Sequence, residues 1–70
     1  MHFEEAMSLV KDGYVLTRAC WENSYLTYNR ENYKIIFNRE EYICGQFMKT
    51  SYGYIPSHSD TVADDWRILE

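Results

Sequence analysis

The sequence predicts an α+β fold in which one N-terminal helix packs on a small antiparallel β-sheet. Two observations predict it: a segment near the N-terminus has the apolar spacing of a helix, and most of the remaining chain consists of short β-rich runs between polar turns. The length of 70 residues allows one small domain, so we assign residues 1–70 to a single domain. A domain of this size is marginally stable, and association with other copies is one source of extra stability.

The helix is expected over residues 3–11. Its apolar residues follow the i, i+3, i+4, i+7 spacing of one helix face: Phe3, Ala6, Met7 and Val10. Glutamates in the first turn and Lys11 in the last turn complement the helix dipole, and Gly13 readily adopts the left-handed conformation that ends a helix. Because the segment is short, it needs a sheet to pack against.

After the helix, the pattern changes to that of an antiparallel meander. The runs expected to form strands are residues 14–20, 25–28, 33–37, 41–50 and 66–69. A further short strand is expected after residue 53, followed by a polar loop that ends at Trp66. Polar turns are expected at residues 22–24, 29–32 and 38–40, with a tight turn at residues 51–53. Gly45 marks an expected bulge or close backbone approach. Residues 60–64 are expected to form a helical turn capped by Ser59 or Asp60.

The charge and apolar patterning argue against several partner classes. The net charge of −4 argues against binding duplex DNA, whose affinity comes mainly from basic contacts to phosphate. No run of 18 apolar residues is present, so we expect no membrane-spanning helix. Glu4 and Glu5 stand where a signal peptide would be basic, and Cys20 and Cys44 lack metal-type spacing. We therefore expect a cytoplasmic protein with reduced thiols.

No catalytic pattern is visible, so we expect a protein that is not an enzyme and that has no cofactor and no metal. His58 lies in a Ser-His-Ser-Asp loop, but neighbours in sequence do not converge as a catalytic triad does. Acidic residues allow two interpretations, a cation site or, more commonly, a solvated acidic face. These residues are Glu22, Glu40, Glu41, Asp64 and Asp65.

Aromatic residues make up 17% of the chain, and seven of them are tyrosines. Such enrichment indicates an interface or an aromatic-lined pocket, or else a small core that uses bulky residues. Trp21 and Trp66 are each either a core or interface anchor or a platform on which a nucleobase stacks. Arg18 and Lys49 are candidate phosphate partners, with a solvated strand face as the alternative for each.

Both ends of the chain carry motifs of one protein family. The N-terminal motifs are MHFEEA, LVKDG, the Thr17-Arg18 pair and Trp21. The C-terminal motifs are Met48-Lys49-Thr50, Gly53, Pro56 and the segment SHSDTVADDW at residues 57–66. Through these motifs the chain resembles a small phage and prophage protein family that includes the second type of Thoeris anti-defence protein, whereas residues 22–47 match no pattern of the family.

The resemblance implies a function. Proteins of this family act as sponges: they bind a cyclic ADP-ribose-type signal made by bacterial TIR enzymes, or a cyclic oligonucleotide, and keep it from its effector without degrading it. They are homo-oligomers with ligands between protomers, so the resemblance implies a dimer or tetramer in the cytoplasm of the bacterial host.

The resemblance also implies site residues. It makes Trp21 the candidate to stack on an adenine and Arg18 the candidate to approach a phosphate or ribose. Ser59 and Asp60 are the candidates for ribose hydroxyls, and Lys49 for a pyrophosphate.

A second hypothesis comes from another class of function. A small phage protein can inhibit a host protein through an exposed aromatic surface, and the candidate residues are Tyr25, Tyr28, Tyr33 and Tyr42. A structural virion component ranks lower, because the sequence has no fibrous or repetitive pattern.

Overall fold

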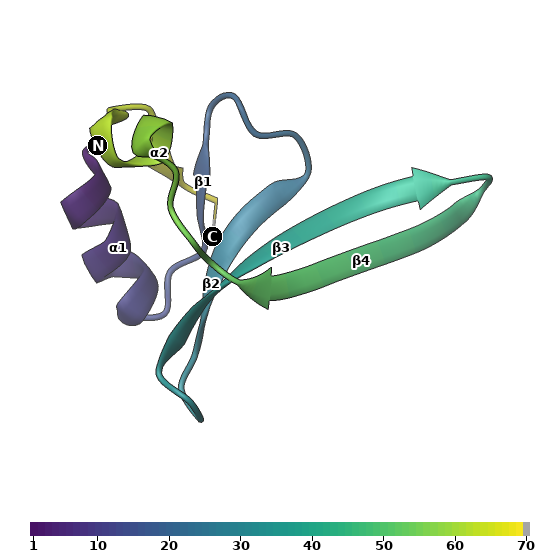
Figure 1. The fold of residues 1–70 in the computed structure, drawn as a ribbon, viewed down its shortest axis with the longest axis horizontal. Coiled ribbons are helices and arrows are strands. Elements are labelled where there is room, and N and C mark those ends of the chain that lie inside the picture. Colours follow the sequence, from purple (N-terminus) through teal and green to yellow (C-terminus); the bar gives the residue numbers. More distant parts are fainter. Residues whose placement is uncertain (70) are drawn as a thin grey trace.

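A computed structural model describes residues 1–69 and confirms the α+β fold class (Figure 1). The elements in chain order are α1 (Phe3–Lys11), β1 (Leu16–Arg18), β2 (Ser24–Asn29), β3 (Lys34–Ile43), β4 (Gln46–Gly53), α2 (His58–Val62) and β5 (Trp66–Ile68). The strands form one antiparallel sheet in the order β4-β3-β2-β1-β5. The first four strands are a meander, and β5 returns to pair with β1.

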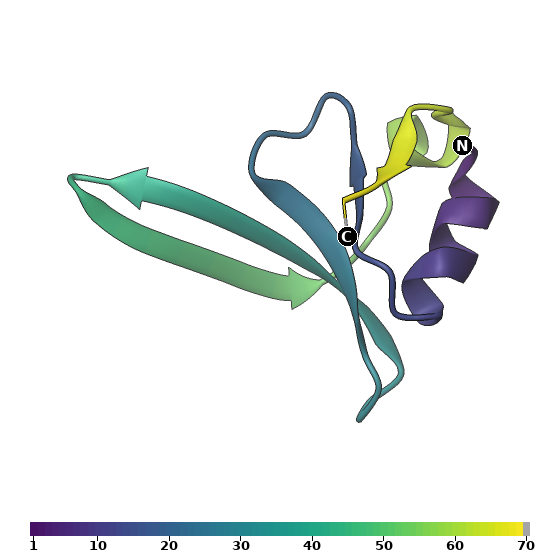
Figure 2. The same cartoon turned by 180° about the vertical axis from the view of Figure 1, so that it is seen from behind.

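Strand register places one row of apolar side chains across the whole sheet. Residues paired across neighbouring strands point to the same face. The row runs through Ile68, Leu16, Leu26, Phe37 and Tyr52. Helix α1 covers part of this face, where it packs against β1, β2 and β5 (Figure 2).

The core is small and lies under α1. Its buried apolar residues are Ala6, Val10, Leu16, Leu26 and Trp66. The predicted helix is confirmed at its expected boundaries, and Gly13 follows it at φ +103°. The amphipathic spacing was sufficient here because the apolar stripe alone decides which side of a helix faces the sheet.

The predicted turn at residues 38–40 is wrong, because these residues lie within β3. Asn38 is buried in the sheet, where its amide nitrogen donates to the carbonyl oxygens of Tyr25 and Ile36 and to Oγ1 of Thr27. Its amide oxygen accepts a hydrogen bond from Ser51 Oγ at 2.9 Å. Apart from Ile36 of the same strand, these partners come from β2 and β4, so the local sequence, which is polar, did not show that Asn38 belongs to a strand.

The chain reverses instead at Cys44-Gly45, between the paired residues Ile43 and Gln46. Both turn residues have positive φ, 53° and 79°, as a two-residue hairpin of the primed type requires. Gly45 therefore makes a hairpin turn rather than a bulge.

Two boundaries near the C-terminus also differ from prediction. Residues 51–53, expected as a tight turn, continue β4, because Tyr52 pairs with Phe37. Helix α2 begins at His58 rather than residue 60, and its N-cap is Ser57. The short C-terminal strand is present as β5.

The β3–β4 hairpin projects from the rest of the molecule as an arm (Figure 1). Every residue of the edge strand β4 is exposed. Apolar side chains on the arm are half or more exposed at Tyr42, Ile43 and Phe47. Among residues 1–69, no helix is long and apolar enough to cross a membrane.

Candidate functional site

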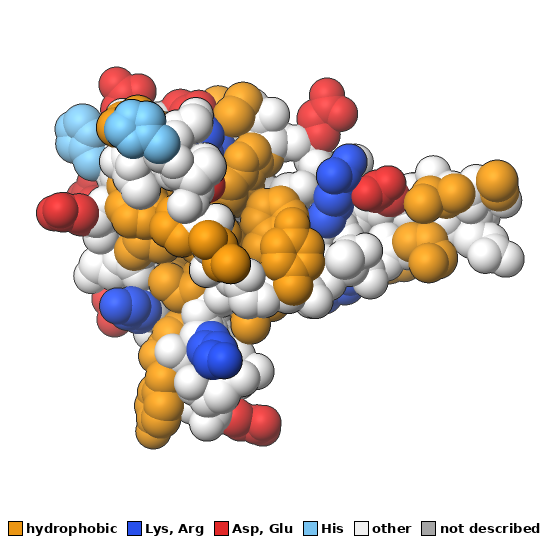
Figure 3. All heavy atoms as spheres, in the orientation of Figure 1, with side chains coloured by type: hydrophobic (Ala, Val, Ile, Leu, Met, Phe, Trp, Pro, Cys, Tyr) orange, Lys and Arg blue, Asp and Glu red, His pale blue; other side chains and the backbone are white. Residues whose placement is uncertain are grey.

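The candidate site is an aromatic pocket at the place where α1 stops covering the sheet. It has a volume of about 290 Å³ and opens at the base of the arm. Figure 3 shows apolar side chains gathered on this face, between the helices and the arm. The lining residues are Trp21, Phe37, Tyr52, Gly53, Tyr54, Ile55, Ser57 and Asp60.

Sheet register and two short loops assemble the pocket. Phe37 and Tyr52 end the apolar row of the sheet, and their rings lie 5.2 Å apart. The loop after β1 carries Trp21 back over the sheet through a turn closed by its backbone N–H and the carbonyl of Arg18. The segment between β4 and α2 adds Tyr54, whose backbone N–H donates to the carbonyl of Ile35.

Trp21 is the aromatic centre of the site. It is half-buried, and its ring meets Phe37 and Trp66 at 5.2 Å in nearly perpendicular contacts, and Tyr54 at 6.3 Å. Perpendicular contacts of this kind fix a ring more firmly than area burial alone. Trp21 therefore joins the core to the pocket, which agrees with its interpretation as a core anchor. Its role as a platform for a nucleobase stays a prediction. Trp66, in contrast, is a core residue at 2% exposure.

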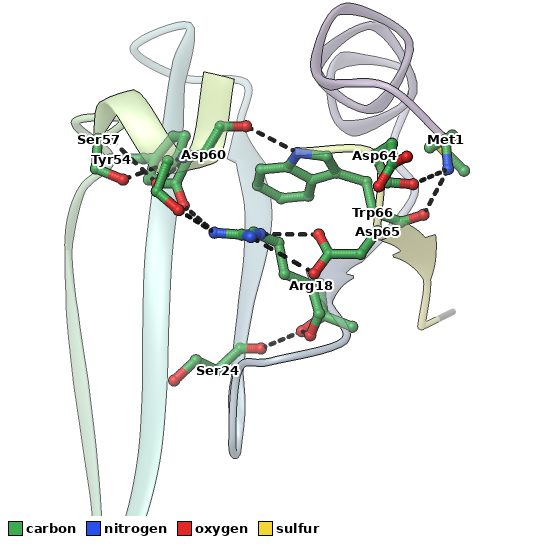
Figure 4. A network of polar contacts seen from close by, with 11 residues as sticks. Met1, Arg18, Ser24, Tyr54, Ser57, Asp60, Asp64, Asp65 and Trp66 are labelled. Carbon is green, nitrogen blue, oxygen red and sulfur yellow. Dashed lines mark hydrogen bonds and ion pairs between the residues drawn. The ribbon is translucent and has the colours of Figure 1, made fainter. Parts of the chain in front are cut away.

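Arg18 joins α2 to the segment just before β5 through two carboxylates (Figure 4). Its Nη1 lies 2.9 Å from Asp60 Oδ1, and its Nε lies 2.9 Å from Asp65 Oδ1. Further contacts of 3.5 Å run from Nη2 to Asp65 Oδ2 and from Nη1 to Ser59 Oγ. The hydrogen bonds that Arg18 donates to Asp65, together with the one it donates to Asp60, raise the pKa of Arg18 despite its burial.

Asp60 is the polar centre of the site. Its Oδ2 accepts hydrogen bonds from Tyr54 Oη at 2.8 Å and from the backbone N–H of Ser57, whose own Oγ accepts from the backbone N–H of Asp60. This reciprocal pair is a capping box that begins α2. Burial raises the pKa of Asp60, but the hydrogen bonds from Tyr54, Ser57 and Arg18 outweigh it and lower the pKa below its ordinary value.

Tyr54 completes the network beside the pocket. Burial, followed by its hydrogen bond to ionised Asp60, raises the pKa of the Tyr54 hydroxyl well above its usual range. On the other side of Asp60, the backbone carbonyl accepts a hydrogen bond from Trp66 Nε1 at 3.2 Å. No buried side-chain nitrogen or oxygen in residues 1–69 lacks a partner.

The structure brings together four of the five predicted site residues. Trp21 and Asp60 line the pocket, and Arg18 and Ser59 lie next to Asp60. Lys49 lies on the arm, on the opposite face of the sheet, where its Nζ is 5.9 Å from the ring centre of Tyr25. In one chain, Lys49 is therefore separate from the aromatic pocket.

Sequence reasoning missed the other aromatic walls. Phe37 and Tyr52 become neighbours only through the β3–β4 register, which the misplaced turn obscured. Tyr54 and Ser57 lie on either side of Ile55-Pro56, in a segment expected as a short strand followed by a polar loop. In this described part of the chain, the expected strand is absent. The sequence signal that was available is Ser57 followed by Asp60, which is a capping-box spacing with Asp in place of Glu.

The described residues contain neither a cluster of metal ligands nor a disulfide. Within residues 1–69, no group of three His, Cys, Asp or Glu side chains is arranged to hold a metal ion. Cys20 and Cys44 are exposed and free.

Comparison with known proteins identifies the family of the chain. A search of curated proteins finds no match to this chain. The family model of the Thoeris anti-defense 2-like domain, in contrast, matches residues 1–69, almost the entire sequence. The chain therefore belongs to the Thoeris anti-defense 2-like domain family, and this membership supports a phage anti-defence role.

Proposed function

We propose that the protein binds a nucleotide-derived immune signal in the aromatic pocket and sequesters it without degrading it. The signal is of the cyclic ADP-ribose type or a cyclic oligonucleotide, and the protein acts as a homo-oligomer in the cytoplasm of the bacterial host. Such a sponge works by mass action, because free signal falls when binding sites outnumber it.

The aromatic pocket is the observation that carries this proposal. Four aromatic rings line it, and aromatic faces bind nucleobases with roughly 1–3 kcal/mol per stacked base. Its volume of about 290 Å³ lies just below the range of small-molecule sites, which span about 300–1,000 Å³. In the proposed homo-oligomer, a second copy would add a wall to this site.

Calorimetric titration tests the proposal directly. The panel consists of cyclic ADP-ribose isomers and cyclic di- and trinucleotides, and bound ligand is recovered after the protein is denatured. We expect tight binding of at least one member and its recovery intact. Absence of binding by every member, or recovery of a cleaved product, contradicts the proposal.

Trp21→Ala links that binding to the pocket. We expect this variant to bind at least tenfold more weakly, because it loses the central ring, while its oligomeric state stays unchanged. Tyr14→Ala is the control, since Tyr14 is an exposed tyrosine outside the pocket. Equal affinity of wild type and Trp21→Ala would place the ligand elsewhere.

The arm favours one competing function, inhibition of a host protein. Tyr42 and Phe47 form an edge-to-face pair that is largely exposed. The four tyrosines proposed from sequence do not form one surface, because Tyr25 and Tyr28 point to opposite faces of β2. Capture of a single host protein by wild type, lost in a Tyr42→Ser/Phe47→Ser variant, would favour inhibition.

A further inference from the structure

We propose that the aromatic pocket of each chain binds only a planar ring of the ligand, uncharged or cationic, and that it excludes phosphate. Arg18 is then a positioning residue and not a phosphate ligand. This inference rests on the proposed function and narrows it, because it states which part of the signal enters the pocket.

The charges beside the pocket are the first argument. Arg18 supplies one positive charge, and Asp60 and Asp65 supply two negative charges, so the cluster carries a net charge of −1. None of the residues that line the pocket is Lys or Arg. A phosphate placed here would meet a net negative cluster in a partly desolvated site, where charge repulsion is weakly screened.

The donor atoms of Arg18 are the second argument. Its Nε, Nη1 and Nη2 all donate to carboxylate oxygens, and the guanidinium is largely buried, with 12% of the side chain exposed. A phosphate that displaced Asp60 or Asp65 from Arg18 would leave a carboxylate without its partner, and removal of one partner from such a pair is costly. The same contacts hold Asp60, and through it Tyr54, at the pocket wall.

The remaining surface of the pocket suits a ring. Asp60 Oδ2 already accepts from Tyr54 and Ser57, so the polar atoms of the network are engaged with one another. What is left for a ligand is mainly the faces and edges of Trp21, Phe37, Tyr52 and Tyr54. Aromatic rings attract planar rings by stacking and attract cationic groups through their negative faces, and those faces repel an anion.

Adenosine, AMP and pyrophosphate separate a ring site from a phosphate site. Titrations of the full chain, followed by tryptophan fluorescence, are expected to show that adenosine binds and that AMP binds no more tightly. Pyrophosphate is expected not to displace adenosine, and the adenosine affinity is expected to be the same at low and high salt. AMP binding more than tenfold tighter than adenosine, displacement by pyrophosphate, or absence of adenosine binding would each overturn the inference.

A matched pair of variants places the adenosine in the pocket. Tyr52→Ala removes one pocket wall, and Tyr14→Ala removes a ring of similar exposure elsewhere, 55% against 45%. Neither residue belongs to the Arg18 network, so we expect both variants to fold. Adenosine affinity should fall several-fold in Tyr52→Ala alone; equal affinities in the two variants would contradict the inference.

Failure of the ring-only pocket can be distinguished from failure of the proposed function. If a cyclic signal binds but pyrophosphate displaces adenosine, the sponge stands and the ring-only pocket is wrong. If adenosine behaves as expected but no cyclic signal binds, the ring pocket stands and the sponge is wrong.

Discussion

Asp60 links three parts of the molecule through one carboxylate and one carbonyl. The side chain caps α2, pairs with Arg18 of β1 and accepts from Tyr54, while the carbonyl accepts from the Trp66 indole. A residue with so many partners in a small domain contributes to stability and to the shape of the pocket at the same time.

Asp60→Asn should therefore destabilise the protein by about 3 kcal/mol, because an amide of the same size leaves Arg18 with one carboxylate and cannot accept at both former oxygen positions. Urea unfolding followed by circular dichroism measures the change. Asp64→Asn is the control, since Asp64 is an exposed neighbour, and it should shift the free energy of unfolding by less than about 0.5 kcal/mol. Similar stabilities of the two variants would show that the network contributes little.

Because the pKa of Asp60 is lowered in the folded protein, the free energy of unfolding depends on pH in the acidic range. A carboxylate with a lowered folded-state pKa contributes stability that is present above its ordinary pKa of about 3.9 and is lost as pH falls through the folded-state pKa. The free energy of unfolding of wild type should thus decline below about pH 4, and more steeply than that of Asp60→Asn. Parallel pH profiles for the two proteins would assign the acid sensitivity to other groups.

At the scale of elements, the helix and the β-rich character of the chain could be predicted, but the register of the long hairpin could not. Residues 3–11 carry their own apolar stripe, so local spacing was enough. The polar sequence around Asn38 predicts a turn, and only the partners of Asn38 in β2 and β4 place it in a strand. The pocket walls Phe37 and Tyr52 depend on that same register, which explains why Trp21 was found from sequence and its neighbours were not.

The Cys44-Gly45 turn gives a prediction that isolates backbone strain. Gly45 has φ +79° with no atom within 4 Å of an added Cβ, so Gly45→Ala should cost about 1 kcal/mol from conformation alone. Gly53 also has open space, but its φ is not positive, so Gly53→Ala should be neutral or slightly stabilising. Thermal unfolding of both variants measures the difference, and equal melting temperatures would contradict the turn conformation.

At the scale of the whole molecule, the arm is the feature that a single chain leaves without a partner. Edge strands with unpaired N–H and C=O groups usually pair, carry charges or are covered. Here β4 is exposed along its whole length and carries a single charged side chain, Lys49. This exposure is what a small domain that assembles with other copies would present.

We therefore expect a dimer or tetramer in solution, measured as molar mass by light scattering after size-exclusion chromatography. A Phe47→Asp/Met48→Asp variant places two like charges on the exposed edge strand and should shift the protein toward monomer. Tyr33→Asp, a change at an exposed tyrosine in the β2–β3 turn, serves as the control and should leave the mass unchanged. A wild-type monomer at all concentrations would rule out self-association and strengthen the case for a host partner.

The edge-to-face contact of Trp21 and Trp66 also has an optical consequence. The two indoles are the only ones in the chain, and at 5.2 Å and 80° their electronic transitions interact. One of them reports on the core and the other on the pocket, so near-ultraviolet circular dichroism records both at once. Folding and occupancy can thus be followed in the same unlabelled sample, because the protein contains its own coupled pair of chromophores.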